Sequence, residues 1–140
     1  MGLEMIYSSR CKMFIQETYR KGRGVFTSGH LPAFIILERC PVLVIPAEEW
    51  AKFPKRGLLD AYVFSWETEG SENRIYRHDG AVGIALGFSS LINHSEMPNA
   101  SFLVDREAGV VDVRTLREIE AGEEILMDYR MCPLPWEFQD

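Results

Sequence analysis

The chain has 140 residues, 46% of them hydrophobic and 26% charged, and its net charge at pH 7 is −6. This length accommodates one domain with a single core and leaves little room for a second. An acidic chain lacks the basic face of a nonspecific nucleic-acid binder. We therefore expect no direct nucleic-acid partner and favour a basic, lysine-bearing protein as partner.

The cysteines Cys11, Cys40 and Cys132 form no close pair, which argues against both a disulfide framework and a zinc site. We expect no metal, and we interpret these cysteines as buried small hydrophobes in a reducing compartment. The N-terminus lacks the pattern of a signal peptide, and no apolar run approaches the roughly 20 residues of a membrane helix. These features predict a cytoplasmic protein without a membrane partner, or a nuclear one in a eukaryote.

The first half of the chain is dominated by short apolar runs separated by glycine and proline. Branched residues with prolines beside them are typical of strands, and two glycines around one residue permit a positive φ angle and a close backbone approach. The predicted elements are a strand at Lys12–Glu17, the turn Gly22-Arg23-Gly24, strands at Phe34–Arg39 and Val42–Ile45 with a bend at Pro41, one or two helical turns within Ala47–Phe53, and a strand at Leu59–Trp66.

The second half continues in the same way. The polar segment Glu67–Asp79 predicts an exposed loop or hairpin tip. The predicted elements after it are a buried strand or short helix at Ala81–Leu86, a hairpin of Ala100–Val104 and Val110–Leu116, a turn at Glu120–Glu123, a strand within Glu124–Tyr129, and an irregular tail at Cys132–Phe138. Many short strands with little helical periodicity predict a mostly β chain. We expect one domain over residues 1–140, with its core at about 12–129 and a tail at 130–140.

A polar segment, Asn93-His94-Ser95-Glu96-Met97-Pro98-Asn99, follows the apolar run at residues 84–88. Such a segment is either a rigid turn, because asparagine tolerates unusual backbone angles, or a binding site. A hydrolase is not favoured, since Ser95 lacks the Gly-x-Ser-x-Gly elbow of a nucleophilic serine. The choice between a turn and a binding site depends on a later segment, Gly122-Glu123-Glu124-Ile125-Leu126-Met127-Asp128-Tyr129.

Together with Gly22-Arg23-Gly24-Val25-Phe26, these segments stand in an order that resembles the SET domain, the β-rich fold of protein lysine methyltransferases. The likeness runs from about Lys12 to Tyr129, and the compact length resembles the small single-domain SET proteins of bacteria and viruses. It implies a β-clip-like fold of several short antiparallel sheets with a knot-like C-terminal crossing. It also implies a transfer of methyl groups from S-adenosylmethionine to a lysine amine of a histone or another protein.

The resemblance implies roles for individual residues. Asn93 would bind the methionine part of S-adenosylmethionine and the His94 backbone would bind the adenine, with the backbone of Arg23 and Gly24 on the other side of the cofactor. Tyr129 would be the active-site tyrosine, and Tyr62 a second tyrosine beside the methyl-transfer channel. Phe102, Met127 and Trp136 are candidates for lining that channel.

Methyl transfer to an amine is an in-line displacement, so alignment in a narrow channel supplies most of the catalysis. A lysine with a pKa of about 10.4 must lose its proton first, and burial beside a cationic sulfonium lowers that pKa. We therefore assign Tyr129 to orientation and not to general-base catalysis. Phe102 and Met127 carry no hydroxyl to hold a water molecule, which favours the addition of more than one methyl group.

Several alternatives stay open. Asn99 is expected to hold its loop together. Trp136 and Phe138 form either a hydrophobic latch on the core or an aromatic wall of the site. Glu96 stands where many SET domains have cysteine, and no cysteine-rich zinc segment follows the domain, so the tail or a second copy of the chain in a homodimer would close the channel. A non-catalytic SET-fold module that binds a peptide is the alternative function.

Overall fold

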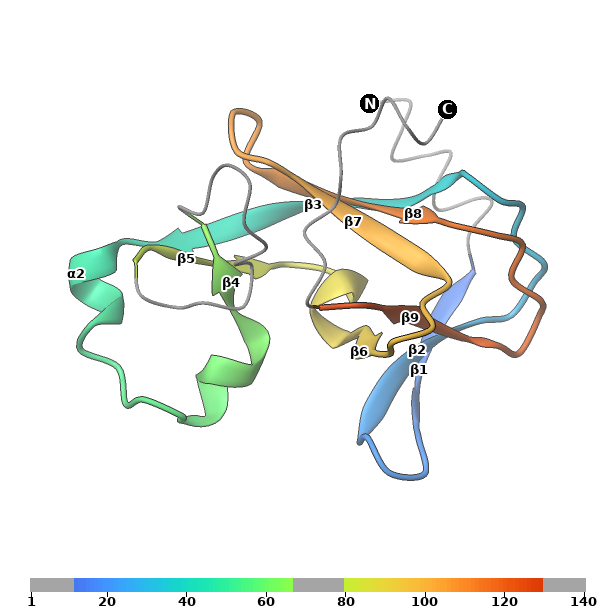
Figure 1. The fold of residues 1–140 in the computed structure, drawn as a ribbon, viewed down its shortest axis with the longest axis horizontal. Coiled ribbons are helices and arrows are strands. Elements are labelled where there is room, and N and C mark those ends of the chain that lie inside the picture. The colour runs from blue at the N-terminus through green and yellow to red at the C-terminus, as the bar shows by residue number, and fades with distance from the viewer. Residues whose placement is uncertain (1–11, 67–79, 130–140) are drawn as a thin grey trace.

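The computed structural model describes residues 12–66 and 80–129, and these residues form mainly short strands (Figure 1). The strands are β1 (Met13–Glu17), β2 (Arg23–Thr27), β3 (Ile36–Ile45), β4 (Phe64–Ser65), β5 (Val82–Ala85), β6 (Asn93–His94), β7 (Ala100–Asp105), β8 (Val110–Thr115) and β9 (Glu124–Met127). The helices are α2 (Ala47–Trp50) and two 3-10 helices, η1 (Leu58–Tyr62) and η2 (Phe88–Leu91). None of these helices is long and apolar enough to cross a membrane. The prediction of a mostly β chain is confirmed.

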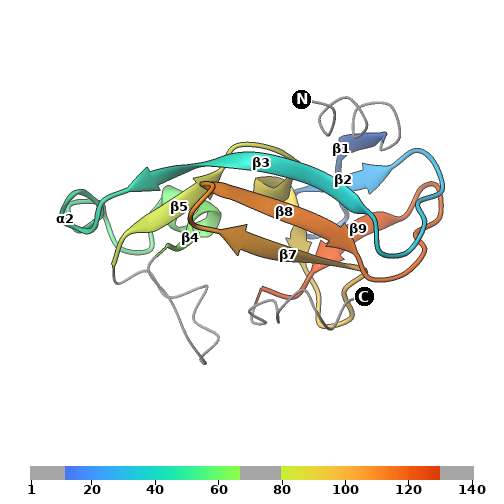
Figure 2. The ribbon, with the colours of Figure 1, turned by 90° about the horizontal axis from the view of Figure 1, so that it is seen from above.

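The strands form two sheets. The five-stranded sheet has the order β4-β5-β3-β8-β7, and Figure 2 shows β3, β8 and β7 lying side by side. The four-stranded sheet has the order β1-β2-β9-β6. In this sheet β9 pairs antiparallel with β2 and parallel with β6. A parallel pair needs a long crossover, and here the crossover contains the β7–β8 hairpin. The last described strand therefore lies between two earlier ones.

The predicted hairpin of β7 and β8 is confirmed, with Ala100 opposite Thr115 and Asp105 opposite Val110. Its turn ends at Gly109, whose φ of 73° suits glycine because a side chain there would be strained. The turn before β9 uses Gly122, with a φ of 90°, in the same way. The expected strands within 12–17, 81–86 and 124–129 are found as β1, β5 and β9.

Two predictions about the first half were wrong. The strand β3 is continuous through Pro41, where it leaves β8 and begins to pair with β5. Proline has no N–H to donate, and this exchange of partners tolerates it. The expected strand at 59–66 is mostly η1, followed by the short β4. Leu59 in η1 and Val63, which directly follows this helix, both pack in the cluster around Trp50.

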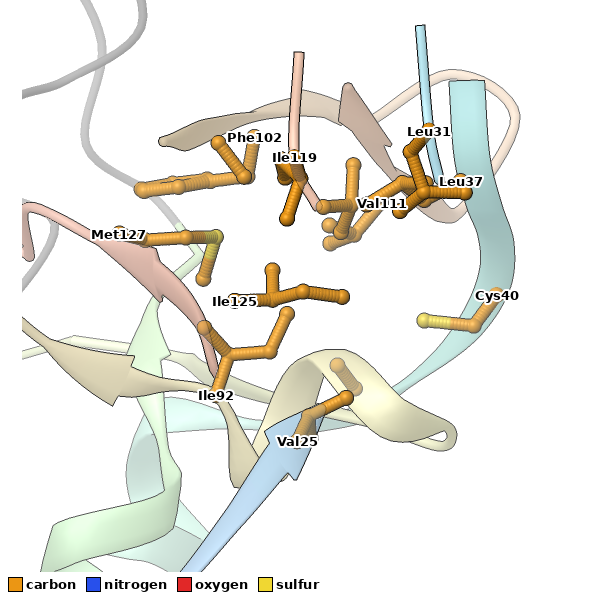
Figure 3. Packing of buried hydrophobic residues seen from close by; sticks show 13 residues of the cluster. Val25, Leu31, Leu37, Cys40, Ile92, Phe102, Val111, Ile119, Ile125 and Met127 are labelled. Atoms are coloured by element: carbon orange, nitrogen blue, oxygen red, sulfur yellow. The ribbon is translucent and has the colours of Figure 1, made fainter. Parts of the chain in front are cut away.

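The main core lies between the two sheets and η2 (Figure 3). Alternation along β9 turns Ile125 and Met127 into this core and Glu124 to the opposite face. Cys40 is buried here, as predicted, whereas Cys11 and Cys132 lie outside the described residues. The predicted loop at 67–79, the tail at 130–140 and the knot-like crossing of that tail also lie outside them.

Candidate functional site

Of the predicted turn Gly22-Arg23-Gly24, only Gly22 lies between β1 and β2, because Arg23 and Gly24 already belong to β2. The two glycines have different tasks. Gly22 has a φ of 75°, which closes the turn, and its carbonyl accepts a hydrogen bond of 2.7 Å from the Thr18 hydroxyl. Gly24 lies inside β2, where a Cβ atom would be 2.5 Å from Oε2 of Glu124 and 2.9 Å from Nδ2 of Asn93. Gly24 therefore permits a close approach of these side chains to the β2 backbone.

Asn93 contacts both neighbouring segments through its side-chain amide. Its Nδ2 donates to the Arg23 carbonyl at 3.0 Å and to Oε2 of Glu124 at 2.8 Å. The Lys21 ammonium donates to the other oxygen of Glu124 at 3.0 Å. We call Gly24, Asn93, Glu124 and the Arg23 carbonyl the polar cradle. It joins residues from all three predicted motifs.

His94 lies beside β9, opposite Met127 in the parallel pair. Its Nδ1 accepts a hydrogen bond of 3.0 Å from the backbone N–H of Tyr129, and its ring centroid lies 5.2 Å from that of Tyr129. An imidazole nitrogen that accepts a hydrogen bond must be unprotonated. The ring of His94 thus contacts the backbone at Tyr129, and its Nδ1 also lies 3.7 Å from Oδ1 of Asp128. That His94 is neither an acid nor a base stays a prediction.

Asn99 is 1% exposed, and its side chain holds β9 in place. Its Nδ2 donates to the Glu124 carbonyl and its Oδ1 accepts from the Leu126 N–H, both at 2.8 Å. Asn99 is therefore structural, as expected, but its side chain ties the loop to β9. The two asparagines of one motif therefore act at different places, Asn99 within the fold and Asn93 within the polar cradle.

Tyr129 directly follows β9 and donates its phenolic hydrogen to the Ile92 carbonyl, one residue before Asn93. Burial raises the pKa of Tyr129 above 10.0, with smaller contributions from the negative charge of Glu124 and from Tyr62. The phenol is consequently neutral at physiological pH and acts as a donor. This state suits a group that orients a reactant and does not suit a general base.

A cavity of about 340 Å³ opens beside Tyr129. We call it the apolar pocket. Its lining includes four residues that the sequence analysis singled out, namely Tyr62, Phe102, Met127 and Tyr129. Phe102 is 8% exposed and Met127 6%, so the inner end is hydrophobic. Tyr62 closes η1 and was expected in a strand, but it reaches the same space.

Sequence reasoning missed some residues of this region. Glu124 was named only as part of a motif, and its contact with Asn93 was not predicted. The glycine at position 24 was a possible signal, because glycine often marks a place where another group approaches the backbone closely. Ser89 and Ser90 of η2 also line the apolar pocket, and no local pattern pointed to them. Trp136 lies outside the described residues, so its place in the channel stays a prediction.

Comparisons with known proteins agree with this geometry. The sequence profile of the SET domain family matches residues 22–130. The histone-lysine N-methyltransferase specific for H3 lysine-37 of Schizosaccharomyces pombe is 33% identical over 120 residues, which are 86% of this chain and 74% of that protein.

Solved structures give the same answer for the fold. A candidate histone methyltransferase of Plasmodium falciparum, PFL0690c, has a TM-score of 0.64 and 25% identity, covering 90% of this chain and 96% of that one. The Neurospora SET domain protein DIM-5, a histone lysine methyltransferase, has a TM-score of 0.64 at 18% identity, with 91% of this chain and 56% of that one covered. The profile match spans most of the chain, and the ordered motifs meet in one site. The chain therefore belongs to the SET-domain family.

Proposed function

We propose that this protein is an S-adenosylmethionine-dependent methyltransferase that modifies the side-chain amine of lysine in a protein substrate. The observation that carries the proposal is the position of Tyr129. Its ring lines the apolar pocket, and its hydroxyl contacts Ile92, the residue before Asn93 in the polar cradle. The polar cradle, as a site for the charged methyl donor, and the apolar pocket, as a site for the lysine side chain, thus adjoin at the neutral phenol of Tyr129.

The residues of the polar cradle fit the cofactor. Gly24 leaves room for the side chains of Asn93 and Glu124 against the β2 backbone, and His94 directly follows Asn93 in β6. We assign the methionine end to Asn93, the adenine to the His94 backbone, and the opposite side to Arg23 and Gly24. When bound, S-adenosylmethionine supplies a methyl group attached to a cationic sulfonium.

The apolar pocket is suited to a lysine stem. Phe102 and Met127, both buried, offer hydrophobic surface to the methylene groups of a lysine side chain. An amine that enters such a pocket is desolvated, which lowers its pKa and favours the neutral nucleophile. Tyr129, held by its bond to Ile92, and Tyr62 then orient the amine.

The extent of methylation follows from the same lining. Neither Phe102 nor Met127 has a hydroxyl that would hold a water molecule against the amine. We infer that the pocket accepts a lysine that already carries a methyl group, so that more than one methyl is added. Mass spectrometry of the product over time tests this, because a single methyl at completion would contradict it.

The proposal for the substrate protein names only its general class. A net charge of −6 favours a basic protein, and the fission yeast relative is named for histone H3. We propose a lysine-containing histone or non-histone protein as substrate, and neither a nucleic acid nor a membrane as partner. We also propose that residues 1–140 form a single domain of the compact bacterial and viral type. The proposed location is cytoplasmic or nuclear, and either the tail or a second copy of the chain in a homodimer is proposed to close the channel.

The decisive experiment measures transfer of radiolabelled methyl groups to lysine-rich proteins by the wild type, Tyr129→Phe and Tyr19→Phe. Tyr19 is 92% exposed and serves as a matched control. We expect transfer by the wild type and the control, and a loss of about 100-fold or more in Tyr129→Phe, as is usual when a positioned catalytic group is removed. A folded protein that gives no heat with the cofactor by calorimetry would instead favour a peptide-binding module.

A further inference from the structure

Glu124 is the residue at which the three sequence motifs meet. One carboxylate oxygen accepts from Asn93 at 2.8 Å, and the other accepts from Lys21 at 3.0 Å. The side chain of Glu124 is 15% exposed, whereas that of Lys21 is 42% exposed. The ammonium thus balances a mostly covered negative charge from the solvent side.

The contacts of Glu124 determine which way the Asn93 amide faces. The Arg23 carbonyl and the carboxylate of Glu124 are both acceptors, so the atom of Asn93 between them must be the nitrogen. Both N–H groups are then occupied. Among the described residues, no hydrogen bond reaches Oδ1 of Asn93, which leaves an acceptor as its free polar atom.

The fixed amide has a chemical preference. An acceptor oxygen suits an ammonium group and disfavours a carboxylate. Gly24 makes the arrangement possible, because any Cβ atom there would separate Glu124 from Asn93. If Glu124 were absent, one N–H of Asn93 would lose its partner, and the amide would be able to rotate and present its nitrogen.

We propose that Glu124 is a positioning residue that holds Asn93 with its oxygen toward the ammonium group of the cofactor's amino-acid end. This inference rests on the proposed function, since it assumes that S-adenosylmethionine binds at the polar cradle. Glu124 acts through Asn93 and contacts no reacting atom.

Two ligands separate this role from a merely structural one. S-adenosylhomocysteine carries the amino-acid end, and 5′-methylthioadenosine lacks it. By calorimetry, we expect Glu124→Ala to weaken S-adenosylhomocysteine about tenfold, the size of one hydrogen bond, and to leave 5′-methylthioadenosine within about twofold. Glu124→Gln, whose side-chain carbonyl still accepts from Asn93, should retain most of the affinity for both.

Glu123→Ala is the matched control. This neighbour carries the same charge, but its carboxylate bonds to the Glu120 N–H and to Arg117, away from Asn93. It should leave both affinities unchanged. Equal weakening of both ligands by Glu124→Ala, or a Glu124→Gln variant as weak as Glu124→Ala, would overturn the proposal.

A readout without ligand complements the calorimetry. In the free protein, the side-chain amide protons of Asn93 should shift in the NMR spectrum of Glu124→Ala and remain near their wild-type positions in Glu124→Gln and Glu123→Ala. Unchanged signals in Glu124→Ala would contradict the positioning role. If the wild type binds no S-adenosylhomocysteine, the proposed function fails, and this NMR test of the Asn93–Glu124 contact still stands.

Discussion

Replacing Asn99 by alanine should damage the fold and not the chemistry. The side chain is 1% exposed and makes two hydrogen bonds of 2.8 Å to the β9 backbone. The variant leaves the Leu126 N–H without its acceptor and removes a donor from the Glu124 carbonyl. Each buried group left without a partner costs about 1–3 kcal/mol, so the loss is roughly 2–6 kcal/mol.

This loss is a large part of a domain's stability of about 5–15 kcal/mol. With an m-value of about 2 kcal/mol/M, the urea midpoint should fall by roughly 1–3 M. Asn93→Ala is the control, because the Asn93 side chain is only half-buried, so water can replace part of its two lost bonds. Urea titrations monitored by circular dichroism measure both variants. A smaller loss in Asn99→Ala than in Asn93→Ala would refute the assignment of Asn99 to the fold.

Three further predictions follow from single groups. Gly24→Ala should fold but bind S-adenosylhomocysteine at least about tenfold more weakly by calorimetry, because its Cβ displaces the ends of two cradle side chains; unchanged affinity would count against the cradle. Burial raises the pKa of Cys40 from 9.0 to about 11, so iodoacetamide should label it at pH 8 far more slowly in the folded protein than in urea, and equal rates would contradict this. Because the pKa of Tyr129 is raised in the folded protein, the neutral phenol contributes to stability below pH 10, and this contribution is lost as the pH rises further. The urea midpoint should therefore fall less at alkaline pH in Tyr129→Phe than in the wild type.

Local patterns predicted much of the fold. The strands β7 and β8 follow each other in the sequence, are both rich in apolar residues and are joined by a turn that ends in glycine. Because they also pair with each other, the hairpin could be predicted from the local sequence. The strand β3 was misjudged because proline is usually a break. Only the tertiary structure shows that Pro41 lies where β3 changes from one partner strand to another.

The sequence predicted most residues of the candidate site, but it did not predict how these residues contact one another. Tyr62, Phe102 and the pair Met127 and Tyr129 come from three separate segments, and the family resemblance had already singled them out. Their meeting at one pocket depends on the parallel pairing of β6 with β9 and on η1, which was expected to be a strand. The contact between Glu124 and Asn93 spans 31 residues and depends on strand register, which no local pattern encodes.

A crystal structure of the protein with S-adenosylhomocysteine tests the central claim most directly. We predict that the amino-acid end lies against Oδ1 of Asn93 and that the sulfur faces the apolar pocket beside the hydroxyl of Tyr129. Ligand bound away from the polar cradle, or a sulfur with no opening toward Tyr62 and Tyr129, would contradict the account.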